Sequence, residues 1–305
     1  MTLIEEGVFR AAAALSVLEA PPTWPELVNS FDRRTAETPI PQLIELQAAL
    51  DWLVRTNVLT VQRGRYFPTS LQAELQPVFS GEEWMPRKLR KARKVARWLA
   101  RLEGVRAVYL CNRTAFGLPH DDGDLDFLLI VRHGSIWQTR GLAGLPFLLL
   151  RDRPQPGKQD RDVVCLSFFL SDQSLNLSDC LLQPDDVYFR QWFLGLLPLV
   201  DDGVGEAFWN ANEAMRARHP LAESWIPSPD VRVAVPRLRI PVSATLERAA
   251  RALQWKYFPR AIRERANQGT HVMISDERLK FHVDDGREGL QQAYAELCAL
   301  YGVTP

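Results

Sequence analysis

Apolar residues recur at helical spacing through the first part of the chain and predict three short helices there. The first helix would bury one face made of Val8, Ala12, Leu15 and Leu18. Thr23, with Glu26 three residues later, has the spacing of a capping box and predicts the start of a second helix. A third helix over residues 41–56 would end at Asn57, a residue type that tolerates the left-handed backbone that stops helices.

Two short apolar segments follow, at residues 58–62 and 65–69, and predict a pair of strands. Arg63 and Gly64 lie between them and suit a tight turn, so the two strands would form a hairpin. Three helices followed by a hairpin are the pattern of a winged helix. We therefore expect residues 1–80 to form a winged-helix domain.

Residues 82–103 predict a longer amphipathic helix whose polar face is strongly basic. A solvated outer face is the interpretation we favour, although such a face could also follow the phosphates of a nucleic acid. The presumed recognition helix of the winged helix carries Glu45 and Asp51 and no basic residue before Arg55, which is poor chemistry for a DNA groove. A nucleic acid partner therefore stays open but is not favoured, and a scaffold or dimerisation role fits the winged helix at least as well. The basic residues are Arg87, Lys88, Arg90, Lys91, Arg93, Lys94, Arg97 and Arg101.

Apolar runs at residues 105–111, 125–131 and 163–170 predict strands that alternate with helical stretches. This alternation indicates an α+β fold, with a mixed or parallel sheet flanked by helices. A proline-rich stretch around residues 220–241 marks a linker, after which residues 244–267 and 288–301 are expected to be helical. The resulting division is a central domain at 81–220 and a C-terminal helical domain at 221–305.

Composition narrows the function only slightly. Lys plus Arg and Asp plus Glu are equal at 37 each, so net charge indicates no partner. The four cysteines are scattered and form no CxxC pair, which argues against a zinc knuckle or a disulfide framework. The N-terminus lacks the basic start of a signal peptide, and no apolar run is long enough to span a bilayer. A cytoplasmic protein with no membrane partner is expected.

Asp124 and Asp126 lie two residues apart at the start of an apolar run, residues 127–131. On a strand this spacing directs both carboxylates to one side, with Cα atoms about 6 to 7 Å apart. Mg²⁺ favours one or two carboxylates together with waters and substrate phosphates. The alternative is a pair of solvated acids at the edge of a loop.

The segment VYLCNRTAFGLPHDDGDLDFLLIV resembles the polymerase-beta-like nucleotidyltransferase superfamily. Members of that superfamily have a strand, Gly-Ser, a short helix and then alternating acids on the next strand. The layout is most similar to a bacterial branch in which a winged helix precedes the transferase core. The resemblance implies that Asp124 and Asp126 hold Mg²⁺ and that the turn of Asn112, Arg113 and Thr114 faces a nucleoside triphosphate.

The sequence also departs from that pattern. Asn112 and Arg113 stand where the superfamily has Gly-Ser, the pair that lets phosphate approach the backbone. Arg113 could compensate by binding phosphate, or it could block the pocket. A third carboxylate is expected on the next strand, and only Asp162 at the edge of that strand is available as the third catalytic acid.

Two functions follow from this comparison. The first is Mg²⁺-dependent transfer of a nucleoside monophosphate from a nucleoside triphosphate to an unidentified hydroxyl acceptor. The second is a catalytically degenerate relative that acts as a nucleotide-binding, regulatory or interaction module. The intact Asp124 and Asp126 favour the first, and the altered turn and the missing acid favour the second. His282 is interpreted as an anchor for the C-terminal helices and is left outside the site.

Overall fold

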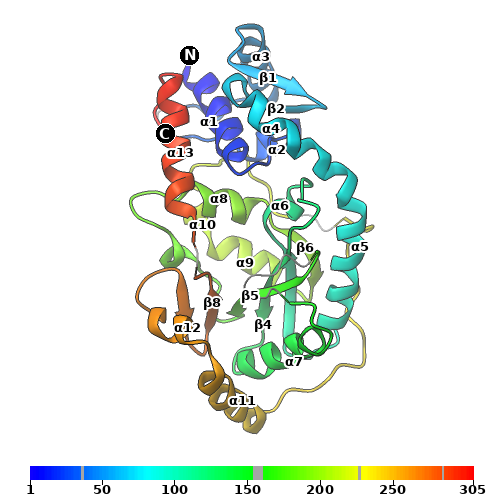
Figure 1. The fold of residues 1–305 in the computed structure, drawn as a ribbon. Helices are drawn as coiled ribbons and strands as arrows, with labels where there is room; N and C mark the ends of the chain where they lie inside the picture. The colour runs from blue at the N-terminus through cyan, green and yellow to red at the C-terminus, as the bar shows by residue number, and fades with distance from the viewer. Residues whose placement is uncertain (36–37, 154–160, 226–227, 284) are drawn as a thin grey trace.

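The computed structural model describes residues 1–35, 38–153, 161–225, 228–283 and 285–305. These residues form a mixed α and β structure in which a central sheet is flanked by helices, as Figure 1 shows. The predicted α+β class is therefore confirmed at this level.

Within the described part of the chain, one sheet has the strand order β6-β3-β4-β5-β8-β7. β4 and β5 are parallel, and the other neighbouring strands are antiparallel. Both faces of β4 are covered, because its side chains contribute to two different apolar clusters; this explains its continuous apolar run. The strands are β3 (Val105–Leu110), β4 (Leu125–Val131), β5 (Val164–Ser171), β6 (Leu197–Asp201), β7 (Val272–Ile274) and β8 (Arg278–Phe281).

Helices cover the two faces of this sheet. The apolar cluster on one face includes residues of α5 (Gly81–Leu99) and α7 (Ile136–Leu149), and α11 (Ala244–Tyr257) packs on α7. The cluster on the opposite face includes residues of α8 (Val187–Leu194) and α9 (Gly205–Ala211). Two further short helices are α6 (Asn112–Ala115), which follows β3, and α10 (Glu213–Arg216), which follows α9.

The N-terminal elements match their predicted local signals. Thr23 and Glu26 form the capping box at the start of α2, and Asn57 has a φ of 59° beyond α3. Arg63 and Gly64 turn the β1–β2 hairpin with φ values of 52° and 73°. The elements are α1 (Leu3–Val17), α2 (Trp24–Asn29), α3 (Leu43–Arg55), β1 (Leu59–Gln62), β2 (Arg65–Pro68) and α4 (Gln72–Leu75).

The C-terminal segment differs from the purely helical one expected. The predicted helix over 244–267 is two helices, α11 and α12 (Arg260–Arg265), because Pro259 between them cannot continue α11. β7 and β8 follow and join the central sheet beside β5. The last helix, α13 (Arg287–Leu300), lies beside α1, as Figure 1 shows, and completes the N-terminal core. Residues 221–305 thus contribute to both cores.

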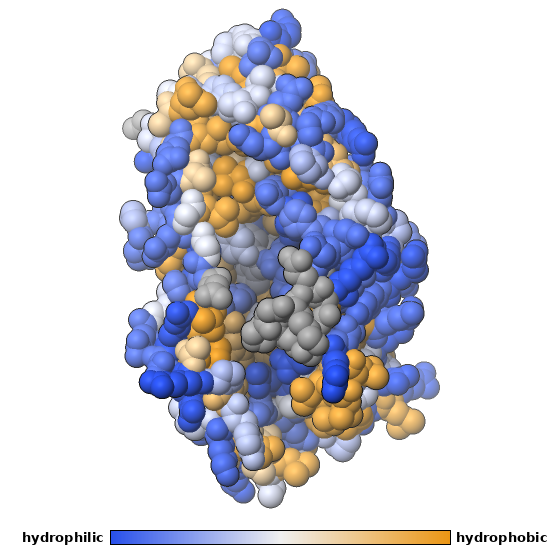
Figure 2. All heavy atoms as spheres, viewed as in Figure 1, coloured by the Kyte–Doolittle hydropathy of each residue, from blue (hydrophilic) through white to orange (hydrophobic). Residues whose placement is uncertain are grey.

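The basic face of α5 has two parts. Lys88 is fully buried in an ion pair, and Arg87 and Lys91 are also ion-paired, whereas Arg90 and Lys94 are exposed. The side of the molecule that α5 forms is mostly hydrophilic in Figure 2. The solvated outer face predicted for this helix is therefore found only on its outermost positions.

Among the described helices, none combines the length and apolar character that crossing a bilayer requires. The apolar surface that stands out lies over the end of α7, where Figure 2 shows a hydrophobic patch. Exposed leucines at this end are Leu145, Leu148, Leu149 and Leu150.

Candidate functional site

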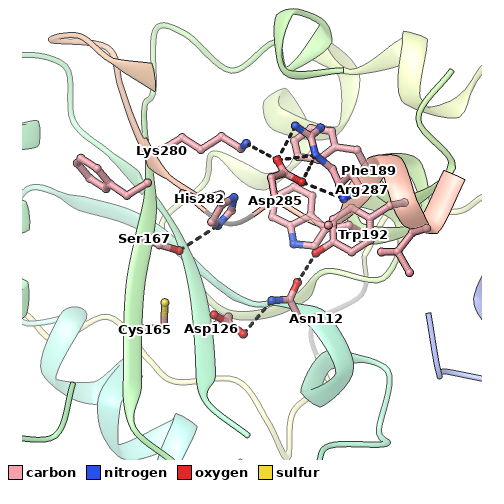
Figure 3. A pocket seen from close by; sticks show the side chains of 14 residues that line it. Asn112, Asp126, Cys165, Ser167, Phe189, Trp192, Lys280, His282, Asp285 and Arg287 are labelled. Atoms are coloured by element: carbon pink, nitrogen blue, oxygen red, sulfur yellow. Dashed lines mark hydrogen bonds and ion pairs between the residues drawn. The ribbon is translucent and has the colours of Figure 1, made fainter. Parts of the chain in front are cut away.

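A cavity of about 320 Å³ opens at the start of β4; of the two predicted acids, Asp126 lines it and Asp124 does not. Its walls come from distant parts of the chain, namely the start of α6, β4, β5, α8, β8 and the start of α13 (Figure 3). The volume is at the lower end of the range for small-molecule sites. Polar side chains that line it are Asn112, Asp126, Cys165, Ser167, Tyr188, Lys280, His282, Asp285 and Arg287, and the aromatic ones include Phe189 and Trp192.

Asp126 is held in this cavity by the turn that ends β3. Asn112, the first residue of α6, has a φ of 58° and donates its side-chain amide to Asp126 Oδ2 at 2.8 Å. The hydroxyl of Tyr188, from α8, donates to Asn112 Oδ1 at 2.9 Å. Asn112 therefore orients the carboxylate, which is a different role from the phosphate contact expected of this turn.

Asp124 lies just before β4 and is electrostatically coupled to Asp126. Burial, and then the negative charge of Asp126, raise the pKa of Asp124 to about 6. Burial also raises the pKa of Asp126, against hydrogen bonds from Asn112 and Cys165 and the charge of Lys88. The charge of Asp126 thus opposes ionisation of Asp124, and a cation bound between them would relieve this repulsion.

Cys165 on β5 is the residue paired with Asp126 across the two parallel strands. A third acid on the next strand would project from this position or from Ser167, and both side chains line the cavity. Burial and the charge of Asp126 raise the pKa of the Cys165 thiol, so it remains protonated and is a poor ligand for Mg²⁺. Of the predicted acid pair only Asp126 lines the cavity, so Asp124 would have to reach a shared Mg²⁺ ion from just outside it, and neither Cys165 nor Ser167 supplies an acid for a second ion.

Asp162 is not among the residues that line the cavity. Its carboxylate accepts from Arg87 Nε at 2.8 Å and forms an ion pair with Lys88 Nζ at 2.7 Å. Lys88 also donates to the carbonyl of Gly123, so this buried ammonium joins the loops that precede β4 and β5. The structure thus places Asp162 in a contact that holds two loops together, beside the cavity that Asp126 lines.

The other two residues of the predicted phosphate turn point elsewhere. Arg113 contacts Glu19 and donates Nε to the carbonyl of Leu118 at 3.1 Å, and burial lowers its pKa to about 10. Thr114 is buried within α6. Neither lines the cavity, so of the three only Asn112 reaches it.

The opposite wall is supplied by the C-terminal segment. His282 Nε2 lies 3.1 Å from Ser167 Oγ, and burial lowers the pKa of this imidazole to about 4, so it is neutral at pH 7. Lys280 is fully buried, pairs with Asp285 at 3.7 Å, and has a pKa lowered to about 8, mainly by burial. Arg287 binds both Asp285 and Asp186. Figure 3 shows this charged group facing the wall formed by Asn112 and Asp126.

Sequence reasoning did not place these C-terminal residues in the site. The segment LKFHVDD alternates apolar and polar positions, which is a strand signal that could have been recognised. Its partner strand could not have been identified, because β5 and β8 are more than a hundred residues apart.

Comparison with protein-family models gives no match for this chain. Curated proteins and solved structures likewise give none. Within the described ranges, no group of three or more His, Cys, Asp or Glu side chains is arranged to hold a metal ion.

Proposed function

We propose that this chain is a polymerase-beta-like nucleotidyltransferase that binds a nucleoside triphosphate and transfers its nucleoside monophosphate to a hydroxyl acceptor. The observation that carries the proposal is the geometry around Asp126. This acid projects from β4 into a cavity, beside the turn that ends β3, and Asp124 lies close enough to be coupled to it. In this proposal the N-terminal helices and hairpin form a winged helix that serves as a scaffold.

Asp124 and Asp126 would hold one Mg²⁺ ion, which would neutralise charge on the triphosphate. The acceptor oxygen bonds to the α-phosphorus as the bond to the bridging oxygen breaks, and pyrophosphate leaves with that electron pair. The proton of the acceptor hydroxyl passes to solvent water, because His282, which lines the cavity, has a pKa lowered to about 4 by burial and is too weak a base to hold it. Trp192 and Phe189 provide aromatic surface for a nucleobase.

A second candidate, nucleotide binding without transfer, is favoured by one specific observation. Cys165 stands beside Asp126 where a third carboxylate would complete a two-metal site. Arg113 is engaged with Glu19 and does not replace the missing phosphate contact. Binding and catalysis therefore have to be measured separately.

Calorimetry with each nucleoside triphosphate, with and without Mg²⁺, tests the proposal. The Asp124→Ala, Asp126→Ala double variant should lose Mg²⁺-dependent binding, whereas Asp122→Ala, an exposed acid in the same loop, should retain it. Binding that needs no metal, or survives the double variant, would support the second candidate. Absence of binding by the folded wild-type protein would refute both.

Transfer is tested by pyrophosphate release. Release that depends on Mg²⁺ and on the acid pair supports the enzyme. If the wild type binds nucleotide but releases none with a panel of small-molecule, nucleic acid and protein hydroxyls, Cys165→Asp provides the next measurement. Gain of release in that variant would show that the thiol is what distinguishes this site from an active one.

A further inference from the structure

A second cavity, of about 350 Å³, lies at the other end of the strand order, between β6 and α9. It shares no lining residue with the cavity around Asp126. Its walls are Tyr109 of β3, Pro198 and Asp201 of β6, Gly205, Glu206, Trp209 and Asn210 of α9, and Ser224 and Trp225.

Tyr109 brings an unsatisfied polar group to this cavity. The residue is 1% exposed, and its hydroxyl has no hydrogen-bond partner among the described residues. A buried hydroxyl normally finds a partner, so an orphaned one indicates a missing ligand or water. Burial, and then the charge of Asp201, raise the pKa of Tyr109, so the group stays a neutral hydroxyl with free lone pairs.

Gly205 lies close to two polar atoms of the cavity, which its lack of a Cβ atom allows to approach the start of α9. A Cβ atom at this position would lie 2.7 Å from Asp201 Oδ2 and 3.3 Å from the hydroxyl oxygen of Tyr109. Asp201 Oδ1 accepts from the backbone amides of Val204 and Gly205 at 2.9 and 3.1 Å. Oδ2 makes no hydrogen bond with the described residues and remains available to a ligand.

The charge and size of the cavity define the ligand class. Two carboxylates, Asp201 and Glu206, line it, and its described lining contains no Lys, Arg or His. A cation is therefore favoured. The volume is too large for a bare ion, and Trp209 and Trp225 provide apolar walls for a hydrocarbon chain.

We propose that this cavity binds a small organic amine, whose ammonium group lies between the Asp201 carboxylate and the Tyr109 hydroxyl. An ammonium has three donors and no acceptor, so it can bond both Asp201 Oδ2 and the hydroxyl oxygen of Tyr109. A second ammonium on a short diamine would reach Glu206 at the rim. The methylene groups contact the two indoles.

Calorimetry at low salt with 1,4-diaminobutane and 1,5-diaminopentane tests this site, with 1,4-butanediol and Mg²⁺ as comparison ligands. Gly205→Ala should weaken diamine binding by about tenfold or more, because the added methyl group would push the Asp201 carboxylate out of its position beside the ammonium. Tyr109→Phe should weaken it by about fivefold without lowering thermal stability. Glu206→Gln should weaken it, whereas Glu213→Gln, the same change at an exposed position of α10, should not.

Diamine binding that responds to Gly205→Ala and Glu206→Gln but not to Glu213→Gln supports the amine site. No diamine binding to the folded wild-type protein would overturn it. Equal binding of 1,4-butanediol would overturn the requirement for charge, and binding of Mg²⁺ with displacement of the diamine would show an inorganic cation site instead. Since the two cavities share no lining residue, none of these results depends on nucleotide binding.

Discussion

Replacing Asp162 by asparagine removes the carboxylate that neutralises the buried ammonium of Lys88. The Lys88 side chain is 0% exposed and that of Asp162 is 10% exposed, so solvent screens their interaction little. Removing one partner of a buried ion pair lowers the free energy of unfolding by about 3 to 5 kcal/mol. Asparagine keeps an oxygen that can accept a hydrogen bond from Lys88, so we expect the loss for Asp162→Asn to be about 3 kcal/mol. At about 2 °C per kcal/mol for a chain of this length, the expected fall in Tm is about 6 °C.

A double-mutant cycle isolates the pair. Lys88→Met alone leaves Asp162 bonded to Arg87, so this variant should lose less free energy of unfolding than Asp162→Asn does. The combined variant should be more stable than the sum of the two single effects predicts, with a coupling energy of about 1 to 2 kcal/mol. Urea unfolding followed by both circular dichroism and tryptophan fluorescence measures these values, and coincident transitions justify treating the unfolding as two-state.

The pH dependence gives an independent check. Burial opposes ionisation of Asp162, but the hydrogen bonds and charges of Arg87 and Lys88 outweigh it and lower its pKa. A lowered carboxyl pKa stabilises the fold above the unfolded value near 4, and this contribution is lost as pH falls through the folded value. The difference in stability between wild type and Asp162→Asn should therefore shrink in acid.

The outcome decides between two roles for Asp162. A loss of stability with Mg²⁺-dependent nucleotide binding retained below the melting transition supports the structural role. An unchanged unfolding midpoint together with lost Mg²⁺-dependent binding would refute it. That result would return Asp162 to the catalytic role expected from its place at the strand edge.

Two further predictions follow from the same structure. Because the pKa of Asp124 is raised to about 6, protons compete with Mg²⁺, and the affinity for Mg²⁺ should fall from pH 7 to pH 5. The raised pKa also means that the ionised carboxylate destabilises the fold. In metal-free unfolding experiments Asp124→Asn should therefore stabilise the protein at pH 8 and have no effect below pH 4. A constant Mg²⁺ affinity across that range would contradict the coupling. Gly81→Ala should destabilise by about 1 to 3 kcal/mol, because its Cβ would lie 2.8 Å from backbone atoms of Leu118 and Pro119. Gly289→Ala, at an exposed helical position with open space, should stabilise by about 0.5 to 1 kcal/mol, and equal shifts in Tm for the two variants would refute this packing argument.

Local signals in the sequence predicted many elements correctly. The run of β4 is predicted to the residue, and the capping box at Thr23 and the turn at Arg63 and Gly64 are confirmed. These features depend on interactions among residues a few positions apart, which the sequence displays directly. The acid pair was also visible, because alternation along one strand is a local property.

Long-range partners were not visible in the same way. The segment 221–305 was expected to be helical, yet its strand β8 pairs Lys280 with Phe168 and so brings His282 to Ser167. Strand pairing across such a separation depends on which apolar faces remain to be buried once the other elements have packed, and no local pattern encodes that choice.

The sequence by itself determined the strands β3, β4 and β5, the capping box at Thr23 and the acids at Asp124 and Asp126, but not the break at Pro259 or the strands of the C-terminal segment. Only the tertiary structure decided that Asp126 lines a cavity, whereas Asp162 pairs with the buried Lys88. Asp126 and Asp162 are both carboxylates near the start of a strand, and the charge and burial of their neighbours separate them. A side chain's chemistry is local, whereas its electrostatic environment is built by residues from across the whole fold.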